Sequence, residues 1–63
     1  MIVVTEIAPG MKLRIAGGLI AEVLENMGDG EWLRVRLLEV PDGASAVAGS
    51  EELCHATDVI ETV

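Results

Sequence analysis

Residues 19–40, LIAEVLENMGDGEWLRVRLLEV, are the stretch that decides the fold, because they read as two β-strands joined by a turn. Along residues 32–40, Leu33, Val35 and Leu37 alternate with Trp32, Arg34, Arg36 and Leu38, which is typical of a strand with one buried face. Along residues 19–25, Leu19, Ala21 and Val23 share one face, and Ile20, Glu22 and Leu24 share the other. Between them, the segment Asn26-Met27-Gly28-Asp29-Gly30 has turn chemistry throughout. This stretch also holds Trp32, the only aromatic residue, so we expect it to supply both core and distinctive surface.

The remaining segments predict further short strands. Residues 2–7 are rich in β-branched side chains, and residues 11–15 alternate apolar with basic positions. Gly17-Gly18 indicates a tight hairpin after residue 15, because glycine adopts the positive φ angles that such turns need. Residues 44–50 are small and predict a loop.

The tail, residues 51–63, permits two interpretations. It reads either as strands at 52–56 and 60–63 with a short turn at 57–59, or as a helix that begins after Ser50. Its many β-branched residues disfavour a helix and favour the strands.

This order of strands and turns resembles the SH3-like small-barrel superfamily, which includes SH3, Tudor and KOW domains. The resemblance rests on Pro9-Gly10-Met11-Lys12-Leu13-Arg14 at the entry and Cys54-His55-Ala56-Thr57-Asp58-Val59-Ile60 at the exit. The second segment is similar to the closing strand, single 3₁₀ turn and last strand of such barrels. The resemblance covers residues 9–63 and implies an all-β fold, a five- or six-stranded SH3-like barrel; the alternative is an α+β fold, a small antiparallel sheet with a C-terminal helix. The length of 63 residues predicts a single domain over residues 1–63. A shared fold implies no particular activity.

Charge and composition exclude several classes of function. The net charge of −7, from 11 acidic and 4 basic residues, opposes binding to nucleic acids and to anionic membranes. The N-terminal residues have no basic region before their short apolar run, so we expect a cytoplasmic protein. The single cysteine, Cys54, allows no internal disulfide, and the chain has no Cys/His set for zinc. We therefore expect no metal and no cofactor.

The outward positions of the hairpin form the candidate site. If the two strands pair so that their residue numbers sum to 56, Glu22 faces Arg34, whereas a sum of 58 places Glu22 opposite Arg36. Lys12 and Arg14 would lie alongside. The predicted binding face consists of Ile20, Glu22, Leu24, Trp32, Arg34, Arg36 and Leu38.

This face has three interpretations. Tryptophan and arginine are enriched at the centres of protein interfaces, which favours a binding surface. The same residues also fit a solvated sheet with cross-strand Arg–Glu pairs, and Trp32 fits a lid over one end of a barrel.

Cys54 and His55 are no catalytic pair, because neighbours on a strand point to opposite faces. The acidic residues of the tail read as a solubilising surface: Glu51, Glu52, Asp58 and Glu61.

We therefore expect a small acidic, non-enzymatic module that binds a protein partner or itself as a homo-oligomer, with a free sheet edge at residues 2–7. The alternative is an oligomeric ligand-binding or catalytic barrel with its site at a symmetry axis. The plasmid-borne type of dihydrofolate reductase is such a barrel, but its Gln-Ile-Tyr site strand has no match near Leu53-Cys54-His55. One Trp is also too few for a Tudor-type aromatic cage or an SH3-type peptide groove.

Overall fold

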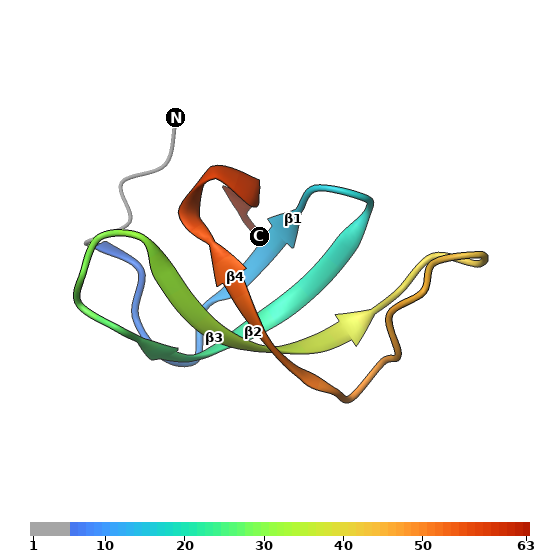
Figure 1. Cartoon of the computed structure of the whole chain (residues 1–63), viewed down its shortest axis with the longest axis horizontal. Helices are drawn as coiled ribbons and strands as arrows, with labels where there is room; N and C mark the ends of the chain where they lie inside the picture. Colours follow the sequence, from blue (N-terminus) through green and yellow to red (C-terminus); the bar gives the residue numbers. More distant parts are fainter. Residues whose placement is uncertain (1–5) are drawn as a thin grey trace.

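The computed structural model describes residues 6–63 (Figure 1). These residues form one antiparallel sheet with the strand order β4-β3-β2-β1-β5. The all-β prediction is confirmed for this part of the chain, and the tail adopts the strand–turn–strand form instead of the helix. The elements are β1 (Lys12–Ile15), β2 (Leu19–Asn26), β3 (Trp32–Glu39), β4 (Glu51–His55), the 3₁₀ turn η2 (Ala56–Asp58) and β5 (Val59–Thr62).

The predicted closed barrel is wrong for the described strands. The sheet is open, and β4 and β5 are its two edges. The chain passes from β4 through the 3₁₀ turn η2 into β5, which pairs with β1, and no pairing joins β4 to β5 among the described strands. Of the strand predicted at residues 2–7, residues 2–5 lie outside the described part, and Glu6 and Ile7 belong to no strand. Ile7 nevertheless packs into the core.

The β1–β2 hairpin turns where the two glycines predict it. Ile15 pairs with Leu19, and the connection contains Gly17 and Gly18 with φ angles of 93° and 82°. An L-residue rarely adopts these angles, so glycine is required at both positions. The long connection between β3 and β4 extends beyond the sheet (Figure 1).

The core lies on the inner, concave face of the sheet. Alternate residues of β3, namely Leu33, Val35 and Leu37, are buried there, as predicted from the alternation. All buried hydrophobic side chains are aliphatic apart from the thiol of Cys54, and Trp32 is not among them. The full buried set among the described residues is Ile7, Leu13, Ile15, Ala21, Val23, Leu33, Val35, Leu37, Cys54 and Val59.

Candidate functional site

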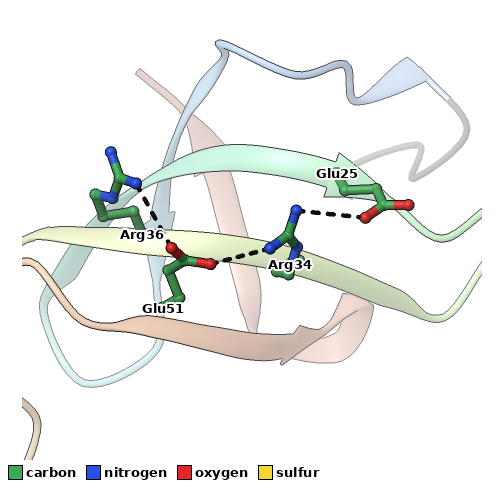
Figure 2. A network of polar contacts seen from close by, with 4 residues as sticks. All are labelled: Glu25, Arg34, Arg36 and Glu51. Atoms are coloured by element: carbon green, nitrogen blue, oxygen red, sulfur yellow. Dashed lines mark hydrogen bonds and ion pairs between the residues drawn. The ribbon is translucent and has the colours of Figure 1, made fainter.

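The outer face of the sheet carries a network of four charged side chains, which we call the ion-pair network (Figure 2). The guanidinium of Arg34 lies 3.0 Å from a carboxylate oxygen of Glu51 and 3.5 Å from one of Glu25. The other carboxylate oxygen of Glu51 lies 3.6 Å from Arg36. The network therefore spans β2, β3 and β4, and each of its arginines has at least one carboxylate partner.

Two β-bulges between β2 and β3 decide which residues meet in this network. In the middle of the hairpin the paired residue numbers sum to 58, with Glu22 opposite Arg36, which is the second of the two predicted registers. A shift between Val23 and Glu25 then moves Glu25 opposite Arg34. Because a one-residue shift exchanges the two faces of a strand, Glu25 reaches the outer face and joins the network.

The same two register shifts separate residues for which the sequence predicts one common register. Ile20 pairs with Glu39, not with Leu38 or Arg36, because a second shift lies between Ile20 and Ala21. Ile20, Glu22 and Leu24 are only half-buried, whereas Leu38 is exposed. The seven predicted residues thus all lie on β2 and β3, but the two shifts interrupt the common register that the sequence predicts for them.

Trp32 lies at the β4 side of the outer face and contacts His55. The two residues pair across β3 and β4, and their rings meet edge to face with centroids 4.8 Å apart. The indole keeps 40% of its surface exposed. The imidazole is oriented in turn by Thr57, whose backbone N–H donates to Nδ1 of His55 at 3.2 Å. Trp32 is therefore a half-covered surface residue and not a lid over the core.

A short acidic turn positions Trp32. The carboxylate of Asp29 accepts the backbone N–H groups of Trp32 at 3.0 Å and of Glu31 at 2.8 Å. These two hydrogen bonds lower the pKa of Asp29, because they favour the charged form of the carboxylate. Asn26 Oδ1 accepts the N–H of Gly28 at 2.9 Å, which tightens the same turn. The turn predicted at residues 26–30 thus fixes where β3 begins.

Three residues of β4 complete the outer face, and the prediction did not include them. Glu51 pairs with Arg36, Leu53 with Arg34, and His55 with Trp32. Leu53 is 60% exposed, the largest exposed fraction among the large apolar side chains of the described strands. The alternation of these three positions with Glu52 and Cys54 indicates that the three share one face of a strand. No local feature of the sequence, however, predicts that β4 pairs with β3.

Cys54 lies on the opposite, inner face, beside an open groove of about 460 Å³. Burial raises the pKa of its thiol to about 11, with a further contribution from the negative charge of Asp58. The thiol is therefore protonated at neutral pH and lacks the thiolate that nucleophilic catalysis or metal binding needs. His55 points to the other face, as expected for adjacent strand residues.

Comparison of the chain with protein-family models, with curated proteins and with solved structures gave no match. Among residues 6–63, no three His, Cys, Asp or Glu side chains gather in a way that would hold a metal ion. No helix in the same part of the chain has the length and apolar character to cross a membrane.

Proposed function

We propose that this chain is a small, non-enzymatic module that binds a protein partner through the outer face of β3 and β4. The observation that carries the proposal is the position of Trp32. A core built from aliphatic side chains leaves the single aromatic residue on the surface, diagonal to the exposed side chain of Leu53, which pairs with Arg34 on the same face. Tryptophan and arginine dominate the energetics of protein interfaces, so a cluster of this kind is suited to binding.

The arginines next to Trp32 would contribute orientation more than affinity. Arg34 and Arg36 already contact Glu51 and Glu25, so a partner's carboxylate competes with carboxylates of the chain itself. A guanidinium has five N–H donors, however, and the ion-pair network occupies only some of them. The partner surface that fits best has an apolar pocket for Trp32 and Leu53, with hydrogen-bond acceptors at the rim near Arg34.

The proposal includes a cytoplasmic location and an SH3-like assignment of the fold. Support for the location is the unpaired Cys54, since disulfides are rare in reducing compartments. Support for the SH3-like assignment is the 3₁₀ turn η2 directly before the last strand, as the resemblance implies, although the described sheet is open.

A matched pair of charge reversals tests the binding face. The full chain is used as bait, and one captured protein is purified and titrated by calorimetry. Arg34→Glu and Trp32→Ala are expected to abolish binding while the circular dichroism stays unchanged. Arg14→Glu is the control, because Arg14 also contacts a glutamate, Glu61 at 3.8 Å, but lies on β1 away from Trp32. Equal losses for both reversals, or binding that survives Trp32→Ala, would show that the face is wrong.

A further inference from the structure

On its side away from β3, β4 presents backbone hydrogen-bonding groups that no other strand of the described residues uses; among them, the carbonyl of His55 accepts the thiol of Cys54 at 3.5 Å. The N–H of Leu37 donates to the carbonyl of Ser50, and the N–H of Ala56 donates to the carbonyl of Glu31, one just before and one just after β4. The β3–β4 register has no shift between these bonds, so hydrogen-bonded pairs alternate regularly along it. The outward-facing N–H and C=O groups are consequently those of Glu51, Leu53 and His55.

The two edge strands, β4 and β5, differ in how readily a further strand could pair with them. The pairing of β5 with β1 is interrupted by a register shift, and a bulge of this kind makes an edge a poor template for another strand. The five residues of β4 pair with β3 without interruption. No strand of the described residues pairs with β4 on its free side. Glu52 and Leu53 on this strand also line two open hollows, of about 460 Å³ and 380 Å³.

We propose that this edge pairs with the same edge of a second copy of the chain, antiparallel, about a two-fold axis at Leu53. Only residues with outward-facing backbone groups can bond to each other, so the allowed registers differ by steps of two residues. In the centred register, Leu53 faces Leu53 of the second copy, and Glu51 faces its His55. A single isologous contact then joins two five-stranded sheets into one.

Charge selects the centred register over its neighbours. A shift in one direction places Glu52 directly opposite Glu52 of the second copy, and like charges in that position are destabilising. A shift in the other direction removes both the Leu53–Leu53 contact and the two Glu51–His55 contacts. In the centred register Glu52 faces Cys54 instead, so no two like charges are directly opposed.

The hydrogen bonds that His55 makes within its own chain leave its side chain able to contact Glu51 of the second copy. Its Nδ1 lies 2.9 Å from the hydroxyl oxygen of Thr57 and 3.2 Å from the backbone N–H of Thr57; because the backbone N–H can only donate, Nδ1 acts as the acceptor and the neutral imidazole carries its proton on Nε2. The Nε2–H is then a donor for a carboxylate across the axis. Glu51 retains acceptor capacity beside its two arginine contacts, because a carboxylate offers about four lone-pair sites. This inference goes beyond the proposed function, since it requires only the free edge of β4 and no second protein on the outer face.

The mass of the chain in solution tests the pairing directly. By sedimentation equilibrium at millimolar concentration, the wild type is expected to approach twice the chain mass of 6.6 kDa. Leu53→Pro is expected to remain a monomer, because proline removes an outward N–H without removing a bond to β3. If Leu53→Pro does not fold, Leu53→Lys serves the same purpose by placing two positive charges against each other at the axis. Ile60→Lys is the matched control on β5 and should still dimerise.

A disulfide variant tests the register. Leu53→Cys combined with Cys54→Ser is expected to form a covalent dimer on oxidation, because Cα atoms of a hydrogen-bonded antiparallel pair are about 5.5 Å apart, within disulfide range. Ile60→Cys with Cys54→Ser should form far less. A wild type that stays at the monomer mass, or a dimer that persists in Leu53→Lys, would overturn the proposal. Neither result depends on the capture experiment with Arg34→Glu, so the two proposals fail separately.

Discussion

Replacing Arg34 tests how much the ion-pair network stabilises the sheet, and we develop this prediction first. Arg34, Glu51 and Glu25 each keep roughly half of their side-chain surface exposed, at 44%, 46% and 55%. Two unit charges about 4 Å apart attract by about 1 kcal/mol in water and by about 4 kcal/mol at an effective dielectric constant of about 20. Ordering two long side chains opposes this attraction, and measured couplings for exposed pairs are about 0.2–1 kcal/mol.

We therefore expect a coupling free energy near the upper end of that range, about 0.5–1 kcal/mol, between Arg34 and Glu51. Their 3.0 Å contact also satisfies hydrogen-bond geometry, which is the reason for placing it at the upper end. The weaker contact with Glu25, at 3.5 Å, should couple less. Both couplings should fall as salt is added, because exposed charges are screened.

The assay is a double-mutant cycle measured by urea unfolding. Arg34→Ala, Glu51→Ala and the double variant are compared with the wild type, with Trp32 fluorescence as the signal. The Arg14–Glu61 pair is the control, since its single contact of 3.8 Å should give a smaller coupling. No coupling between Arg34 and Glu51 at low salt would refute the reasoning, and so would a coupling above about 2 kcal/mol, which is the behaviour of a desolvated pair.

Three further predictions concern the core, the thiol and the turn. Leu33 is fully buried, so Leu33→Ala should destabilise the fold by about 2–5 kcal/mol in chemical unfolding, whereas the same truncation at exposed Leu53 should cost little, and equal losses would contradict the assigned faces. The raised pKa of Cys54 favours the neutral thiol, so its contribution to stability is complete below the ordinary thiol pKa of 9.0 and is lost as pH rises through about 11. Cys54→Ala should therefore flatten the dependence of the unfolding free energy on pH across that window, and an unchanged slope would count against a buried thiol. The lowered pKa of Asp29 means that its contribution to stability is present above the ordinary carboxyl pKa of 3.8 and is lost as pH falls further, so Asp29→Asn should reduce the loss of stability in acid. An acid titration identical to that of the wild type would show that the turn hydrogen bonds contribute nothing.

Much of the fold follows from local patterns in the sequence. Alternation along β3 predicts that Leu33 and Val35 are buried, and the structure confirms this. Gly17-Gly18 predicts the first hairpin, and β-branched residues in the tail predict strands instead of a helix. These features depend on each residue's own φ and ψ preferences and on its immediate neighbours, so they can be predicted without knowledge of long-range contacts.

The candidate site was predicted only in part, because its decisive contacts are long-range. The bulge near Leu24, which moves Glu25 to the outer face, has no marker such as glycine at that position. The face also depends on β4, whose Leu53 and His55 lie opposite residues of β3 that are some twenty positions away in the chain. Strand pairing at that separation is decided by how whole elements pack, not by the residues on either strand alone.

For residues 11–63, the sequence by itself determined the strands, the turns, the aliphatic core and the surface position of the basic residues, since periodicity and turn chemistry act over a few residues. Tertiary structure alone decided that the sheet formed by the described residues stays open, that Trp32 meets His55, and that no strand in this part of the chain pairs with the free edge of β4. The hairpin of residues 19–40 thus supplies β2 and β3, two of the three internal strands of the sheet, and half of the outer face. The other half comes from β4, which becomes its neighbour only when the core is packed.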